Sequence, residues 1–186
     1  MSWAKVWRCR WHSQHLSAET FKAIFAWHGI SMRGQAMPRE TPRQAGLFYI
    51  HYSKPLVELV PAMLLYSNNF MANQIFLALG QERFGPPVTW RKARRAINLF
   101  IRQRGLSGRE ITIIDGAGLH RGNRITARTM LAFLQEFRPY AHLLPQHKEW
   151  LLKSGTMTDV YAYAGYLGRH DAAPAVVIIL NQPDKN

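Results

Sequence analysis

The chain has 186 residues, of which 47% are hydrophobic, and it carries a net charge of +13 and one cysteine. This length suits one domain with a core of its own and excludes two large ones. No stretch approaches the roughly 18 apolar residues of a membrane span, Cys9 has no partner for an internal disulfide, and the histidines lack a zinc signature, so no metal site is predicted.

The positive charge is concentrated between residues 83 and 109, where arginines and lysine occur with no acid among them. Such a field favours an anionic partner, for example a phosphate-bearing cell-wall polymer or a membrane surface, and a solvated helix face is the plain alternative. Only Trp90 and Phe100 interleave aromatic rings with these cations, and no known reading motif is present. Nucleic acid is therefore disfavoured as a partner.

Residues 1–16 form a basic segment, which we expect to precede a single domain over residues 17–186. Trp3, Trp7 and Trp11 are spaced by four, which suits either a stripe at a membrane interface or a packed or frayed end. The segment has the basic start of a secretory signal but lacks its apolar stretch and cleavage site. We therefore expect a cytoplasmic start or an internal fragment of a longer protein.

The next part of the chain predicts one helix followed by two strands. Ser17 is a candidate cap for a helix over residues 17–28, which Gly29 would end in a left-handed conformation. Alternating side chains predict strands over residues 30–37 and 44–52.

Two helices are predicted around a polar junction. Pro55 suits the first turn of a helix that runs to about residue 65, and the internal Pro61 would bend or loosen it. Residues 67–69, Ser-Asn-Asn, interrupt the run because their short side chains bond local backbone groups. A second helix then runs over residues 70–79 and stops at Gly80.

The remainder predicts two capped helices and then a change of period. Thr89 caps an arginine-rich helix that ends before residue 105, and Thr126 caps another. Between them lies a short strand over residues 110–114. The last strands are predicted over residues 149–154, 157–167 and 174–181. Helices in the middle and strands at the end predict an α/β fold in which helices cover an antiparallel sheet.

Three segments together resemble one known family. Residues 51–73 contain Ser-Lys-Pro-Leu and then Tyr-Ser-Asn-Asn, residues 115–126 read Asp-Gly-Ala-Gly-Leu-His-Arg-Gly-Asn-Arg-Ile-Thr, and residues 153–157 read Lys-Ser-Gly-Thr-Met before Ala-Gly-Tyr-Leu at 164–167. In this order and with these flanks they resemble the D-alanyl-D-alanine carboxypeptidase/endopeptidase family of class C low-molecular-mass penicillin-binding proteins. Each short motif alone is weak.

The resemblance implies a penicillin-binding transpeptidase-like fold and acyl-serine chemistry on peptidoglycan peptides, in the periplasm or cell envelope. That chemistry requires no metal and no organic cofactor. By resemblance, Ser67 passes a proton toward the leaving group, Asn69 binds the substrate amide, and Lys153 supplies positive charge beside Ser67 and the substrate carboxylate.

The resemblance also implies a substrate strand. Ser154, Gly155 and Thr156 would bind the terminal carboxylate or the backbone of an extended peptide that adds to the sheet. Asp115, Gly116 and Gly118 are expected to support a glycine-rich loop, and catalysis by Asp115 is the less favoured alternative.

The family's nucleophile motif, Ser-x-x-Lys, has no counterpart in a matching context. Ser2-Trp-Ala-Lys5 fits the spacing, but a four-residue pattern arises by chance and this one lies at the end of the chain. Residues 17–37 already resemble the family's segment after its inserted domains, so we expect the N-terminal half of the fold to be missing. We therefore predict an inactive chain alone that binds β-lactams only if a nucleophile is present. The alternative is a non-catalytic module that binds peptidoglycan or an anionic polymer.

Overall fold

The computed structural model describes residues 13–37 and 39–182. The chain divides into two compact units, Met1–Tyr52 and Ser53–Asn186, and each is described by itself. Ser2, Lys5, Cys9 and the three N-terminal tryptophans lie outside the described residues. In the described part, no helix has the length and apolar character needed to cross a membrane.

The first unit contains one helix, α1 (Ser13–Trp27). It begins four residues before the predicted start, so Ser17 lies within the helix and the prediction that it caps the helix is wrong. Gly29 adopts the left-handed region with φ 77°. Its N–H bonds to the carbonyl of Ala26, and the N–H of Ile30 bonds to that of Phe25. The predicted glycine stop is confirmed.

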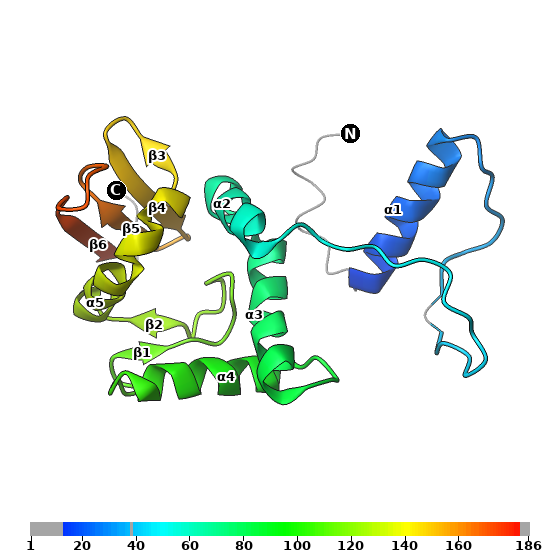
Figure 1. Ribbon diagram of the computed structural model, residues 1–186, viewed down its shortest axis with the longest axis horizontal. Helices are drawn as coiled ribbons and strands as arrows, with labels where there is room; N and C mark the ends of the chain where they lie inside the picture. Colours follow the sequence, from blue (N-terminus) through cyan, green and yellow to red (C-terminus); the bar gives the residue numbers. More distant parts are fainter. Residues whose placement is uncertain (1–12, 38, 183–186) are drawn as a thin grey trace. The chain divides into compact units, whose positions relative to one another are not determined.

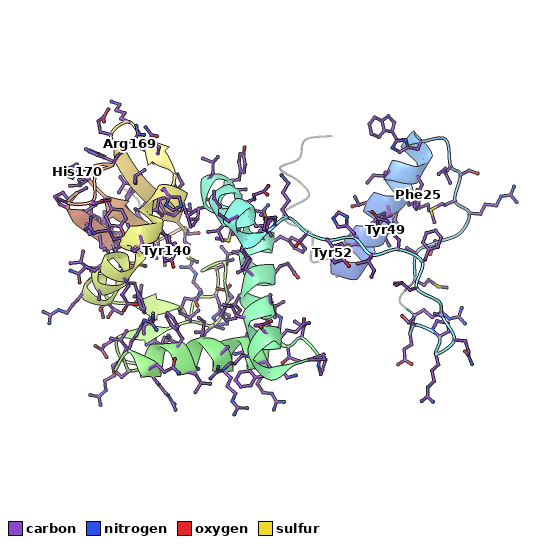
Figure 2. All side chains as sticks on the ribbon, viewed as in Figure 1. Phe25, Tyr49, Tyr52, Tyr140, Arg169 and His170 are labelled. Carbon is purple, nitrogen blue, oxygen red and sulfur yellow. The ribbon has the colours of Figure 1, made fainter. Side chains whose placement is uncertain are left out.

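The strands predicted over residues 30–37 and 44–52 are not formed, since the described part of this unit contains no paired strand. Alternation of side chains sets which face each residue takes, but a strand also needs a neighbour for its backbone groups. Tyr49 and Tyr52 remain 75% and 80% exposed (Figure 2). The segment therefore has the side-chain pattern of a strand without the partner that would make it one.

The second unit opens with two helices that meet at the polar junction, α2 (Leu56–Tyr66) and α3 (Asn69–Phe84) (Figure 1). Pro55 immediately precedes α2, and Ser67 ends it in a left-handed conformation with φ 48°. Asn68 caps α3, because its Oδ1 accepts the N–H of Met71 at 3.0 Å. The predicted break at the Ser-Asn-Asn turn is confirmed.

Gly80 does not end α3, so that prediction is wrong. The helix continues to Phe84, and Gly80 is buried where α3 packs on α4 (Trp90–Gln103). A Cβ at Gly80 would lie 2.4 Å from the backbone nitrogen of Ala93. Glycine is used here for a close approach of two helices and not as a stop.

Both threonine caps are confirmed. Thr89 Oγ1 accepts the N–H of Lys92 at 3.2 Å at the start of α4, and Thr126 Oγ1 accepts that of Thr129 at 3.1 Å. Thr126 is the N-cap of α5 (Ala127–Phe137). The 3₁₀ helix η2 (Arg138–Leu143) follows α5 directly. The strand predicted over residues 110–114 is shorter than expected: β1 (Ile111–Thr112) pairs antiparallel with β2 (Arg124–Ile125).

The last part forms a four-stranded antiparallel sheet in the order β3-β4-β5-β6. Its strands are β3 (Gln146–His147), β4 (Trp150–Thr156), β5 (Val160–Tyr166) and β6 (Ala175–Asn181). Leu134 of α5 and Tyr166 of β5 form the centre of the core, and the Tyr166 hydroxyl donates to the carbonyl of Leu134. The predicted mixture of helices and an antiparallel sheet is confirmed, and α5 packs on β5 and β6.

Candidate functional site

Ser67 and Lys153 are brought together from opposite ends of the second unit. Ser67 lies at the turn between α2 and α3, and Lys153 lies in the middle of β4. The Lys153 Nζ donates to the Ser67 Oγ at 2.5 Å and to the carbonyl of Ser154 at 2.7 Å. An ammonium that donates to a hydroxyl leaves that hydroxyl's own proton free for a further partner. The pair can therefore pass a proton to a bound group.

Lys153 pairs with Ala164 of β5, which in turn pairs with Val177 of β6, so the three residues share one sheet face. Burial on this apolar face lowers the pKa of the Lys153 ammonium, because desolvation penalises the charged form. Lys153 is thus a cation held at a partly apolar surface, a state that favours contact with an anionic substrate group.

The outer edge of β4 is open beyond Lys153. The short strand β3 pairs only with Trp150 and Leu151, and the N–H of Leu152 bonds outward to the carbonyl of Pro145. Because backbone groups alternate along a strand, the N–H groups of Ser154 and Thr156 also point outward. Within the described residues no strand pairs with them there. An extended peptide can add at this edge.

The side chains of Ser154 and Thr156 are exposed, as substrate ligands would be. Gly155 is exposed too, and a Cβ built there would meet only Ala162 at an ordinary 3.8 Å. The described residues therefore give no steric reason for glycine at 155. Asn69 is the first residue of α3 and is half-buried beside Ser67.

Asp115 braces its glycine-rich loop. Its Oδ1 accepts the N–H of Gly118 at 2.9 Å and the Nδ2 of Asn123 at 2.7 Å, while its Oδ2 accepts the N–H of His120 at 3.1 Å. Gly118 has φ 74°, a region that L side chains adopt at a cost. These bonds occupy both carboxylate oxygens, which favours the supporting role for Asp115 over a catalytic one.

Two asparagines that bond to this loop were not singled out in the sequence. Asn73 Oδ1 accepts the N–H groups of Gly116 and Ala117 at 3.0 and 3.1 Å, which ties the loop to α3. Asn123 Oδ1 accepts the N–H of Ile114 at 2.7 Å and closes the loop from its far end. The helical spacing of four from Asn69 was a signal for Asn73, because such residues share a helix face.

A cavity of about 800 Å³ lies between this loop and the sheet face that carries Lys153, but neither Ser67 nor Lys153 lines it. Its floor is apolar, with Ala162, Val177 and Ile179 among the lining residues. Among the described residues no group of three or more His, Cys, Asp or Glu is placed to hold a metal ion.

The chain is similar to known proteins in both sequence and fold. The family model described as the D-Ala-D-Ala carboxypeptidase 3 (S13) family matches residues 2–145. The chain belongs to this family. The match ends before Lys153.

Two curated relatives carry carboxypeptidase names. D-alanyl-D-alanine carboxypeptidase DacB of Haemophilus influenzae is 25% identical over 163 residues, which are 75% of this chain and 34% of the relative. D-alanyl-D-alanine carboxypeptidase of Actinomadura sp. (strain R39) is 26% identical over 122 residues, which are 64% of this chain and 22% of the relative. The chain thus spans about a third or less of these relatives.

Two solved structures share the fold. Both are penicillin binding protein 4 (dacB) from Haemophilus influenzae, one of them complexed with a β-lactam. The complexed structure has a TM-score of 0.68 at 24% identity and covers 89% of this chain and 44% of that chain. The other has a TM-score of 0.74 at 22% identity and covers 91% of this chain and 43% of that chain.

The environment of Lys153 predicts that its amine titrates below an ordinary lysine. We expect the ¹³Cε resonance of Lys153 to reach its midpoint below the ordinary lysine value of 10.5, with the signal assigned by its loss in Lys153→Met. A midpoint at or above that value would contradict the burial argument.

The same lowered pKa sets the sign of a pH effect on stability. The unfolded chain holds the proton more tightly than the folded one, so the free energy of unfolding gains from Lys153 as pH rises from the lowered pKa toward the ordinary value of 10.5. Below that window both states are protonated and the burial cost persists. Lys153→Met should lack this alkaline gain in a chemical denaturation series.

Proposed function

We propose that this chain supplies the assisting side of a serine acyl-transfer site that acts on peptidoglycan peptides ending in D-Ala-D-Ala. The observation that carries the proposal is the hydrogen bond from Lys153 to Ser67 beside the open edge of β4. Membership of the carboxypeptidase family supports the same substrate class. The proposed setting is the cell envelope, with the periplasm inferred from the resemblance.

In this proposal the substrate lies along β4. Its backbone takes the outward N–H groups of Ser154 and Thr156, and their hydroxyls and Lys153 receive the terminal carboxylate. Asn69 holds the amide of the substrate. The reaction requires no metal and no organic cofactor.

The chemical step needs a serine that the described residues do not provide in the family's context. Its Oγ would bond to the carbonyl carbon of the penultimate D-alanine, and the bond to the terminal D-alanine nitrogen would break. Ser67 would give its hydroxyl proton to that leaving nitrogen and regain one from the attacking serine through a lysine. Water then hydrolyses the ester. Ser67 itself is engaged by Lys153 and fits the relay role better than the attack.

A fluorescent penicillin tests the missing nucleophile. We expect the purified chain to form no covalent labelled band, because Ser67 is placed as a relay and Ser2-Trp-Ala-Lys5 reads as a chance match. Heat-denatured chain serves as the background control. A stable band abolished by Ser2→Ala would identify that serine as the nucleophile, and a band abolished by Ser67→Ala would overturn the relay assignment.

A second candidate function, non-catalytic binding of a linear anionic polymer, is favoured by α4. Arg91, Arg95 and Arg102 are exposed and fall on one side of the helix at 100° per residue, with no acid anywhere in α4. Figure 2 shows nitrogen-tipped side chains along the outer side of α4. This stripe holds no large apolar side chain to insert into a bilayer, and arginine matches phosphate geometry. A phosphate-bearing wall polymer therefore suits it better than a membrane.

Binding to long-chain polyphosphate tests the stripe. Changing Arg91, Arg95 and Arg102 together to glutamine should weaken binding roughly tenfold at low salt, since each exposed charge contact contributes up to about 1 kcal/mol. The matched control changes Arg33, Arg39 and Arg43, three exposed arginines of the first unit, to glutamine. Equal weakening by both triple variants would show a net-charge effect only. Preferential binding to anionic vesicles or to duplex DNA would replace the polymer assignment.

A further inference from the structure

Ser67 and Lys153 are separated by 86 residues in the chain, so the contact between them depends on how α3 and β4 are held. Their direct hydrogen bond is one connection. A second connection runs around the site through the glycine-rich loop at residues 115–122, which we call the Asp115 loop.

The first link of this second connection is Asn73. It lies one helical turn after Asn69, and its Oδ1 receives two backbone N–H groups of the Asp115 loop. Gly116 is pressed on the same helix: an added Cβ would lie 2.4 Å from the carbonyl oxygen of Ala72 and 2.6 Å from the Cβ of Phe76. The start of the loop therefore has little freedom to move relative to α3.

The second link is the loop itself. Asn123 Nδ2 donates to Asp115 Oδ1, which also accepts the N–H of Gly118, and Asn123 Oδ1 accepts the N–H of Ile114 just before the loop. His120 Nδ1 accepts the N–H of Gly122 at 2.9 Å. With this many internal hydrogen bonds the loop is a rigid unit, so its two ends are held at a fixed distance from each other.

The third link is Arg121, whose Nη1 donates to Asp159 Oδ1. Asp159 lies in the tight turn between β4 and β5, which the bond from Met157 N–H to the Val160 carbonyl closes at 2.8 Å. The carbonyl of Asp159 also accepts the N–H of Gln182 at 2.9 Å, just beyond β6. Arg121 thus attaches the loop to the tip of the hairpin that carries Lys153.

We propose that Asn73 and the Arg121–Asp159 pair are positioning residues that close a ring of contacts and thereby hold Ser67 against Lys153. The ring runs from Ser67 along α3 to Asn73, through the Asp115 loop to Arg121, and back along β4 to Lys153. The inference rests on the proposed function for its purpose, since it assigns these residues to the same acyl-transfer site. Its geometry, however, stands on the contacts themselves.

The Arg121–Asp159 link is exposed, with 58% and 40% of the two side chains accessible. Exposed ion pairs contribute little to global stability. If the Arg121–Asp159 pair has no positioning role, truncating Arg121 should leave the surroundings of Lys153 unchanged. If the pair holds the β4–β5 hairpin in place, the same change should alter those surroundings.

The test follows the ¹³Cε titration of Lys153 in the full chain. Asn73→Ala and Arg121→Ala should each move the Lys153 midpoint upward, toward the ordinary lysine value of 10.5, because a loosened hairpin lets water reach the ammonium. Asn73→Asp keeps the oxygen acceptor and Arg121→Lys keeps the cation, so both should stay near the parent. Arg104→Ala, which breaks the separate exposed pair with Glu136, is the matched control and should cause no shift.

The double variant Asn73→Ala/Arg121→Ala separates a ring from two independent supports. If the contacts form a ring, one substitution already breaks it, so the double variant should shift the Lys153 midpoint little more than the larger single variant does. If Asn73 and Arg121 act independently, the double variant should show the sum of the two single shifts. An unchanged Lys153 midpoint in folded Arg121→Ala would overturn the proposal, even if Asn73→Ala failed to fold. A D-Ala-D-Ala peptide that does not bind the parent chain would count against the proposed function alone.

Discussion

The hydrogen bond between Lys153 and Ser67 is the constraint on which the site depends. It connects the α2–α3 junction to the middle of β4. The position of each partner also depends on the structure around it. Ser67 holds a left-handed backbone with φ 48°, which costs a non-glycine residue roughly 1–2 kcal/mol. The cap by Asn68 and the start of α3 offset that cost. The strained turn at Ser67 thus lies where the Ser67 hydroxyl accepts a hydrogen bond from the Lys153 ammonium.

We propose that Ser67 acts as a proton relay and not as the attacking nucleophile. The Ser67 hydroxyl accepts from a cation, and the open edge of β4 lies directly beside it. The chain belongs to the S13 carboxypeptidase family. The chain spans 43% to 44% of the solved structures that it resembles. The proposed acyl transfer needs an attacking serine in addition to the Ser67–Lys153 pair.

Sequence reasoning succeeded where structure is decided locally and failed where distant segments decide it. Thr89 and Thr126 were predicted as caps because a cap needs only its own first turn. Gly80 was read as a stop, yet its role is set by a helix that follows later in the chain. Residues 44–52 have strand alternation without a partner strand. Asn73 was missed because its bonds to the Asp115 loop cross 43 and 44 residues.

The most direct test of this account is a double-mutant cycle on the free energy of unfolding with Ser67→Ala, Lys153→Met and the double variant. If the side chains are bonded as described, the two changes should be coupled by roughly 0.5–1.5 kcal/mol, the usual contribution of such a hydrogen bond. Additivity within about 0.3 kcal/mol would show that Ser67 and Lys153 act independently and would contradict the central claim.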